Sequence, residues 1–282
     1  MKIAITGGGG FIGVATRRHA QELGHEAWTF DRADGHDILD DLGGLKGAEA
    51  VIHLAGLLGT HELFTSVQDA IDVNITGSYR VMDWCLNNDA NYVGITMPDA
   101  FPSIYTATKI ATQRIATALH HSRGLRVSHV RAFNAYGPGQ KHGPGHPQKI
   151  IPTFATAAWR GEPIPVWGDG TQTVDLIHVD DVARILVRAC SLTDNEVIDA
   201  GTGTALTVNQ VANYILRTTQ SMGGIRYLPM RDGEKPTNIV AKGEGWDLMD
   251  FRPLFLWPDL GATVRWYRDG EGRHLYRDLR RL

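Results

Sequence analysis

Cysteine is scarce in this sequence, and so are long apolar runs and any excess of positive charge. The two cysteines, Cys85 and Cys190, fall within helical patterns, so a disulfide framework is excluded and a reducing compartment is favoured. No apolar run approaches the ~20 residues that span a bilayer, and Met1 leads directly into a strand pattern, so no signal peptide is expected. The formal net charge of −3 offers no basic surface for nucleic acid. The sequence therefore predicts a cytoplasmic protein without membrane or nucleic-acid partners.

The first half of the chain alternates between strand and helix patterns. Short apolar segments predict strands at residues 2–6, 26–30, 50–54, 92–96 and 125–131. Longer amphipathic segments between them predict helices at residues 11–23, 65–87 and 105–121. This alternation predicts an α/β fold with a doubly wound parallel sheet covered by helices on both faces.

A glycine turn follows the first predicted strand. Gly7, Gly10 and Gly13 come after that strand and open the first helix, where glycine permits a tight turn and a close approach of backbone to a pyrophosphate. The helix N-terminus beyond the turn offers free N–H groups to phosphate. With Asp31 at the end of the next strand, this context matches the dinucleotide-binding fingerprint and predicts a Rossmann domain.

Asp31 also bears on which dinucleotide is bound. Its carboxylate would accept hydrogen bonds from both ribose hydroxyls and repel a 2′-phosphate, which favours NAD. Arg32 beside it is the counter-argument, because an arginine at this place can hold the 2′-phosphate of NADP. We expect NAD, with NADP as the alternative.

The pattern of expected elements changes after Asn134. Residues 137–147 form a Gly/Pro-rich loop, and shorter mixed elements follow, with strands expected near 174–178 and 196–199. We expect a second, smaller α/β domain that binds the substrate. Residues 1–165 would form mainly the NAD-binding Rossmann domain, which also receives roughly 176–205, and the substrate domain would take 135–175 and 206–282.

Tyr105 and Lys109 are spaced four residues apart at the start of the helix predicted at 105–121. On a helix this spacing places both side chains on one face. A free tyrosine has a pKa near ~10, and a cation within roughly 4–6 Å lowers such a pKa by about 1–3 units, toward the range in which a general base works. The pair therefore suggests a tyrosine that acts as acid or base on an alcohol or carbonyl.

Taken together, these motifs resemble those of the extended short-chain dehydrogenase/reductase family, specifically its NAD-dependent nucleotide-sugar epimerases and dehydratases. Thr6–Gly13 resembles the family's glycine turn, and Tyr105 with Lys109 its catalytic pair. The further matches are Asp37-Ile38, His53–Gly56, Asn74, Arg131–Pro138 (Arg-x-x-Asn-x-Tyr-Gly-Pro), Gly168–Asp181 and Arg231–Glu234 (Arg-x-Gly-Glu). The resemblance runs nearly from end to end of the chain.

The resemblance implies a resident NAD and oxidation of a sugar at C4. Tyr105 would take the hydroxyl proton, and Lys109 would bind the nicotinamide ribose and lower the tyrosine pKa. The 4-keto sugar then acidifies its neighbouring C–H bonds, which permits epimerisation or elimination before hydride returns. Cofactor binding is implied for Gly7, Gly10, Phe11, Ile12, Gly13, Asp31, Arg32, Asp37, Ile38, Leu54, Ala55, Gly56, Asn74, Tyr105 and Lys109.

The resemblance also implies how substrate and partner are bound. The nucleotide sugar would contact Thr60, Asn134, Lys149, Arg231 and Glu234. The two helices at 65–87 and 105–121 would pair with those of a second copy to form a four-helix dimer interface. No metal is expected, because His142 and His146 have no carboxylate or cysteine to complete a ligand set.

The chain departs from the family where a Ser or Thr normally hydrogen-bonds the reacting oxygen. Met97 falls at that position, and a thioether cannot donate a hydrogen bond. We expect Thr96 to take this role, with Ser103 or Thr108 as alternatives. The loop before Tyr105 is also shorter than in the family, which leaves the site more open, and Val174 stands where many relatives have an arginine on the diphosphate.

Asp99 lies two positions beyond Met97, where the family varies its chemistry between glutamate and cysteine. Lys149 precedes Phe154 at the spacing of a lysine found in related 3,5-epimerases. The two residues could form an acid/base pair acting on carbons next to the C4 ketone; a turn aspartate and a solvated lysine is the alternative.

The sequence favours an NAD-dependent nucleotide-sugar epimerase. A 4,6- or 5,6-dehydratase is the near alternative. A catalytically inert dinucleotide-binding protein is the alternative from another class, and Met97 and the short loop are what support it.

Overall fold

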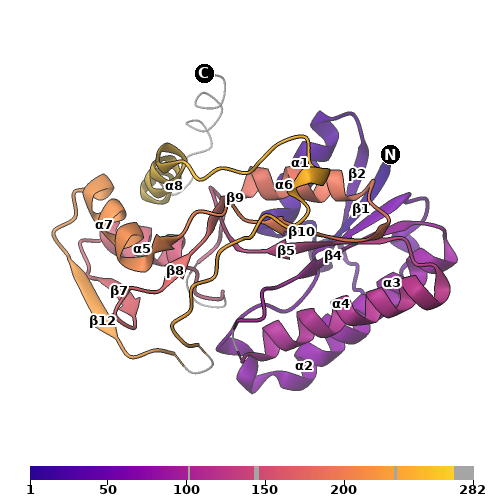
Figure 1. The fold of residues 1–282 in the computed structure, drawn as a ribbon, viewed down its shortest axis with the longest axis horizontal. Helices are drawn as coiled ribbons and strands as arrows, with labels where there is room; N and C mark the ends of the chain where they lie inside the picture. The colour runs from indigo at the N-terminus through magenta and orange to yellow at the C-terminus, as the bar shows by residue number, and fades with distance from the viewer. Residues whose placement is uncertain (101, 143–145, 232–233, 270–282) are drawn as a thin grey trace.

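The computed structural model describes residues 1–100, 102–142, 146–231 and 234–269, and its centre is a six-stranded parallel sheet (Figure 1). The strands lie in the order β10-β5-β4-β3-β1-β2. β2 lies on one side of β1 and β3 on the other, so the strand order reverses between β1 and β3, where open α/β sheets bind their ligands. The strands are β1 (Lys2–Thr6), β2 (Glu26–Phe30), β3 (Ala50–His53), β4 (Asn91–Thr96), β5 (Val127–Ala132) and β10 (Asp194–Ala200).

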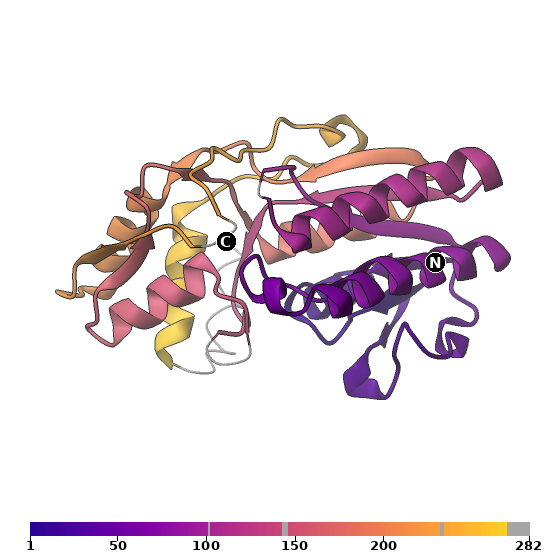
Figure 2. The same ribbon diagram turned by 90° about the horizontal axis from the view of Figure 1, so that it is seen from below.

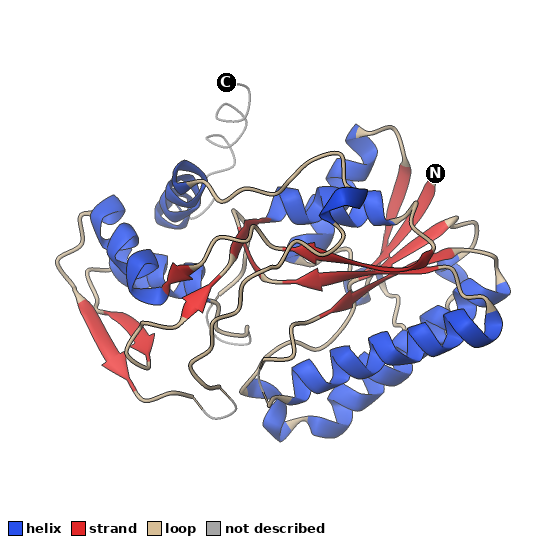
Figure 3. Ribbon diagram, viewed as in Figure 1, coloured by secondary structure: helices blue, strands red, loops and turns tan. Residues whose placement is uncertain are grey.

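Helices cover both faces of this sheet (Figures 2 and 3). α1 (Phe11–Glu22) and α6 (Val179–Ala189) pack together on one face, and α3 (Ser78–Asn87) and α4 (Ile104–Arg123) lie on the other. The strand residues alternate accordingly, since Ile52 belongs to the cluster on the α6 side and Val51 to the cluster on the α3 side. The predicted doubly wound α/β fold is therefore confirmed.

Among its described residues, the second half of the chain adds three two-stranded sheets and three helices around a separate hydrophobic cluster. Phe154, Val166, Ile215 and Val264 lie in this cluster, fully or almost fully buried. Residues 1–165 therefore contribute to the clusters on the two faces of the main sheet and also to this separate cluster. The predicted domain boundaries stay a prediction. The elements are β6 (Asn134–Tyr136) with β9 (Leu176–His178), β7 (Ile164–Trp167) with β12 (Ile225–Leu228), β8 (Thr173–Val174) with β11 (Leu206–Thr207), α5 (Ile150–Trp159), α7 (Val208–Thr219) and α8 (Trp257–Asp269).

Two segments differ from the predicted elements. The strand expected at 174–178 is divided at Asp175, whose buried carboxylate accepts hydrogen bonds from Thr202, Gly203 and Ala241. The helix expected at 65–87 is a short α2 (Val67–Ile71), a π-helical stretch (Asp72–Gly77) and then α3. Single π-helical turns are frequent at functional sites, and this one carries Asn74.

Within the part of the chain that is described, no helix combines the length and apolar content that crossing a membrane requires.

Candidate active site

The glycine turn brings three backbone segments into contact at the carboxyl end of β1. A Cβ added to Gly7, whose φ is +69°, would lie 2.7 Å from the Ala55 nitrogen, and one added to Gly13 would lie 2.5 Å from the Gly7 oxygen. Gly10 precedes α1, and no side chain caps that helix. The first N–H groups of α1 are thus left for another acceptor, and phosphate is the group that such a helix start favours.

Asp31 is fixed beside the turn, at the end of β2. Its carboxylate accepts hydrogen bonds from the backbone N–H groups of Gly9 and Ala33, both at 3.0 Å. Arg32 points instead toward Asp37, with 3.5 Å between the Arg32 Nε and the Asp37 Oδ2. The geometry therefore places a carboxylate, and not a guanidinium, over the glycine turn, which fits the unphosphorylated ribose of NAD.

The remaining predicted cofactor residues lie around the same edge of the sheet. Leu54, Ala55 and Gly56 follow β3, and Phe11 and Ile12 begin α1. Ile38 is buried and its Cδ1 lies so close to Gly77 that a Cβ there would approach it to 2.5 Å.

Lys109 is almost fully buried, and its ammonium group lies above Gly56. A Cβ added to Gly56 would be 3.0 Å from the Lys109 Nζ and 2.8 Å from the Asn74 Oδ1. Burial lowers the pKa of Lys109 to about 8. No group in the described part of the chain forms a hydrogen bond or ion pair with this ammonium, so it is available to a ligand.

Asn74 connects the loop after β3 to α4. Its Oδ1 accepts a hydrogen bond from the Leu57 N–H at 2.8 Å, while its Nδ2 donates to the Leu57 oxygen and to the Thr108 Oγ1, both at 3.1 Å. All of its amide groups are thus used within the protein, and the residue positions Gly56 and α4 relative to one another.

A series of hydrogen bonds connects Thr6, at the end of β1, through His53 and Ser78 to Asn74. The Thr6 Oγ1 lies 2.7 Å from the His53 Nδ1, and the His53 Nε2 lies 2.8 Å from the Ser78 Oγ. The Ser78 hydroxyl in turn donates to the main-chain carbonyl oxygen of Asn74. Since Ser78 donates onward, it accepts from Nε2–H, and Nδ1 accepts from Thr6. Burial lowers the pKa of His53 to about 3, so the ring is neutral and the direction is fixed.

Tyr105 lies in the first turn of α4, one helical turn from Lys109, as predicted. Ser103 caps the helix, because its Oγ accepts a hydrogen bond from the Thr106 N–H at 3.2 Å. In the protein alone burial raises the pKa of Tyr105 to about 12. The lowering of the Tyr105 pKa that was expected from Lys109 is therefore not seen in the protein alone.

The three hydroxyls considered as replacements at Met97 are all engaged elsewhere. The fully buried Thr96 donates to the Gln113 Oε1 at 2.6 Å, Ser103 donates to the Thr106 Oγ1 at 3.1 Å, and Thr108 donates to the main-chain carbonyl oxygen of Tyr105 at 2.9 Å. The catalytic role expected for Thr96 stays a prediction, and its bond to Gln113 argues against it.

Arg231 lines a cleft of about 640 Å³ and is paired with Glu234. The Arg231 Nε donates to Glu234 at 3.0 Å and its Nη1 to Gln148 at 3.2 Å, while the guanidinium lies 4.7 Å from the centroid of the Trp167 ring. Lys149 lies nearby. Sequence reasoning missed Gln148 and Trp167, although Gln148 is the direct neighbour of Lys149.

Lys149 and Asp99 have different surroundings. Burial lowers the pKa of Lys149, with Glu62, Arg231 and Glu234 as its charged neighbours, whereas Asp99 is exposed and lines another groove beside Met97. No contact among the described residues joins the two side chains, so the acid/base pair stays a prediction. Asn134 begins β6, with its N–H donating to the Asp175 oxygen at 3.1 Å, and Thr60 lies in the loop after β3.

The described residues contain no cluster of three or more His, Cys, Asp or Glu that could hold a metal ion.

A parallel sheet with a glycine turn at its strand reversal, and a Tyr-Lys pair beside it, defines a dinucleotide-binding protein of the short-chain dehydrogenase/reductase class. The chain belongs to the NAD dependent epimerase/dehydratase family, whose model matches residues 3–201. Nucleotide-sugar epimerases and dehydratases are thus its homologues.

Three relatives show how far the similarity extends. The chain is 26% identical over 239 residues to a UDP-glucuronate 4-epimerase of Thermodesulfobacterium geofontis, covering 78% of this chain and 72% of the relative. It is 28% identical over 320 residues to a dTDP-glucose 4,6-dehydratase of Streptomyces antibioticus, covering 95% and 93%. The structure of MoeE5 in complex with UDP-glucose and NAD matches with a TM-score of 0.83 and 28% identity, covering 96% and 99%.

Proposed function

We propose that this protein is an NAD-dependent nucleotide-sugar epimerase that works through transient oxidation of the sugar at C4. The observation that carries the proposal is the position of Tyr105 and Lys109 on one face of α4, with the Lys109 ammonium above Gly56 and beside Asn74. This pair lies at the same edge of the sheet as the glycine turn. A dinucleotide and a proton-transfer group thus meet at one site.

The site fits NAD. The cradle at Gly7 and Gly13 leaves no room for a Cβ, the start of α1 has no side-chain cap, and Asp31 lies over the turn. When bound, NAD supplies the acceptor for hydride from the sugar C4 and later returns it. The Lys109 ammonium, which has no partner within the described chain, would hold the nicotinamide ribose.

Tyr105 would exchange the proton of the sugar C4 hydroxyl. Because burial raises its pKa to about 12, the phenol is protonated in the protein alone and needs neighbouring positive charge to act as a base. Lys109 supplies part of this charge, since a pKa of about 8 keeps it largely protonated at neutral pH. Tyr105 returns the proton when the 4-keto sugar is reduced.

Arg231, Glu234, Lys149 and Asn134 would bind the nucleotide part of the substrate. Arg231 lines the cleft and is a charged neighbour of Lys149, and these two cations would compensate for Val174, where many relatives have an arginine. Trp167, under the Arg231 guanidinium, offers an aromatic face next to this cleft. Thr60 would contact the sugar from the loop after β3.

A 4,6- or 5,6-dehydratase is the second candidate, and Asp99 is the observation that favours it. Its exposed carboxylate follows Met97 in the groove beyond β4, where it could move a proton on a carbon next to the C4 ketone. The similarity to a dTDP-glucose 4,6-dehydratase over 95% of the chain supports this candidate.

A homodimer completes the proposal. Phe64, Val67, Ile71 and Tyr79 are large apolar side chains that are 38–42% exposed, and they recur at helical spacing along the segment from the 3-10 turn Glu62–Thr65 to α3. Such a stripe is buried when two copies pair. With α4 beside it, the stripe would form the expected four-helix interface.

A panel of uridine- and thymidine-diphosphate sugars in deuterated water tests the proposal. Epimerisation through a 4-keto sugar at a neighbouring carbon incorporates solvent deuterium, epimerisation at C4 itself inverts the substrate without it, and a dehydratase releases water. Failure of the whole panel to give any of the three would contradict an enzymatic function and favour the inert dinucleotide-binding protein.

A further inference from the structure

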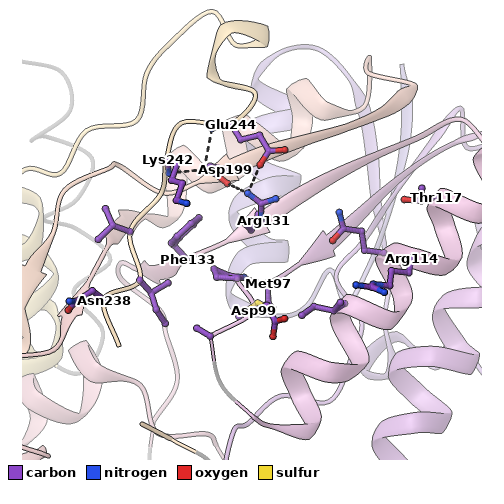
Figure 4. Close-up of a pocket in the computed structure, with 16 residues that line it drawn as sticks. Met97, Asp99, Arg114, Thr117, Arg131, Phe133, Asp199, Asn238, Lys242 and Glu244 are labelled. Atoms are coloured by element: carbon purple, nitrogen blue, oxygen red, sulfur yellow. Dashed lines mark hydrogen bonds and ion pairs between the residues drawn. The ribbon is translucent and has the colours of Figure 1, made fainter. Parts of the chain in front are cut away.

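A groove of about 750 Å³ lies beyond the carboxyl ends of β4, β5 and β10 (Figure 4). One wall is α4 and the other is the segment 238–244, and Met97 and Asp99 line the groove where β4 ends.

The groove adjoins the proposed active site through α4. Tyr105, Lys109 and Gln113 follow one another at intervals of four residues, so they share one stripe of the helix, and Gln113 lines the groove. Phe133 lines it as well and directly precedes Asn134, which is proposed to bind substrate. Gln113 and Phe133 thus connect the groove to the proposed active site.

The floor and the walls of the groove differ in chemistry. Met97, Ile110, Phe133 and Val240 provide apolar surface. Arg114 on the helix wall and Lys242 on the opposite wall are exposed, and neither side chain forms a hydrogen bond or ion pair with any described residue.

The carboxylates deeper in the groove are already engaged by groups of the protein. Arg131 contacts Asp199 at 2.9 Å and Glu244 at 2.6 Å. The second oxygen of Asp199 accepts hydrogen bonds from three backbone N–H groups, those of Lys242, Gly243 and Glu244. Asp99 is the remaining acid of the groove, and Arg114 and Lys242 are cations that have no partner in the described part of the chain.

We propose that this groove is a substrate subsite for an acidic substituent of the sugar, whose carbon body lies on the apolar floor and whose carboxylate lies between Arg114 and Lys242. This rests on the proposed nucleotide-sugar function and narrows it, because the preferred substrate would be a nucleotide sugar that carries a carboxyalkyl or carboxyacyl group. A charge-assisted hydrogen bond from each cation to this carboxylate would favour an acidic substituent over a neutral one.

Calorimetric titration of the NAD-loaded protein with three matched ligands tests the subsite. UDP-glucose has no substituent, UDP-N-acetylglucosamine has a neutral one, and UDP-N-acetylmuramic acid adds a lactyl ether that ends in a carboxylate. We expect the acidic ligand to bind about tenfold more tightly than UDP-N-acetylglucosamine. Arg114→Gln and Lys242→Gln should each lower that ratio about threefold or more, while Lys46→Gln, an exposed lysine outside the groove, should not change it.

Each result decides a different question. A wild-type ratio near one, or a ratio that both groove variants leave unchanged, would overturn the acidic subsite. Binding of none of the three ligands would contradict the proposed nucleotide-sugar function itself. Because both side chains are exposed, we expect the two variants to keep the wild-type melting temperature. A lower affinity ratio in such a variant does not come from misfolding.

Discussion

Lys109 is held at a cost to stability because its charge is buried without a partner in the described chain. Burial lowers its pKa to about 8 from its ordinary value of 10.5, so the ammonium, although still the major form at neutral pH, is less favourable in the folded protein than in the unfolded chain. A residue that destabilises the fold and faces the cofactor cradle has the character of a functional group, since active sites retain such residues.

Replacing Lys109 with methionine should therefore separate stability from function. We expect the free energy of unfolding to rise by about 1–3 kcal/mol, because one pKa unit corresponds to about 1.4 kcal/mol, and turnover to be lost. Urea unfolding and an activity assay measure the two effects. Lys46→Met, at an exposed position, is the control with little change in either; a destabilised Lys109→Met protein would contradict the account.

His53 makes stability depend on pH in a predictable direction. Its pKa is about 3 in the fold and 6.5 ordinarily, so between these values the unfolded chain binds the extra proton. The free energy of unfolding therefore falls as pH drops below about 6.5, with a slope of up to about 1.4 kcal/mol per pH unit from this ring. The ring's stabilising contribution is fully present above pH 6.5.

His53→Gln should be less stable at pH 7 but should lose less stability on acidification. Between pH 7 and pH 5 we expect the loss to be smaller than in the wild type by about 2 kcal/mol. His129, whose pKa burial lowers to about 4, keeps part of the acid sensitivity in both proteins. Chemical unfolding at pH 7 and pH 5 measures the free energy of unfolding of both proteins. An equal loss in the variant and the wild type would show that the ring does not titrate as described.

At the scale of elements, the predictable parts are those that local sequence determines. The strands at 2–6 and 26–30 appear with the predicted bounds, and α4 extends the predicted helix by one or two residues at each end, because periodicity and flanking glycines encode them locally. Asp175, which divides a predicted strand, accepts hydrogen bonds from residues 202, 203 and 241. Partners this distant in the sequence leave no local pattern.

The glycine turn is the element whose tolerance can be tested most cleanly. Gly7 and Gly24 both have positive φ, +69° and +79°, but a Cβ at Gly7 would meet the Ala55 backbone at 2.7 Å, whereas one at Gly24 would meet nothing within 4 Å. Gly24→Ala should cost about 1–2 kcal/mol of stability and keep NAD binding. Gly7→Ala should cost more and weaken NAD binding at least tenfold, measured by titration of the cofactor-free protein; equal effects of the two variants would contradict the close packing.

At the scale of the whole molecule, the candidate site assembles from segments that the sequence keeps far apart. The Tyr105 and Lys109 pair and the glycine turn could be predicted because each is a local motif. The neighbours of Lys149, namely Glu62, Arg231 and Glu234, and the groove beyond Met97 could not, since they depend on how the second half of the chain folds back across the sheet.

The dimer proposed for this molecule depends on the apolar stripe along α2 and α3. Ile71→Glu places a charge in the middle of that stripe, and we expect it to convert the dimer to a monomer in sedimentation at micromolar concentration. Met222→Glu changes a side chain that is 97% exposed outside the stripe and should leave the dimer intact. A dimer that survives Ile71→Glu would place the interface elsewhere.

The central claim, that Tyr105 drives a reversible oxidation of a nucleotide sugar, is tested most directly by the absorbance of NADH at about 340 nm after rapid mixing of the NAD-loaded protein with substrate. For the wild type we predict a transient rise and decay within a turnover. Tyr105→Phe removes only the phenolic oxygen, so it should retain NAD and fold while forming NADH at least about 10²-fold more slowly. NADH formation in Tyr105→Phe at the wild-type rate would contradict the account.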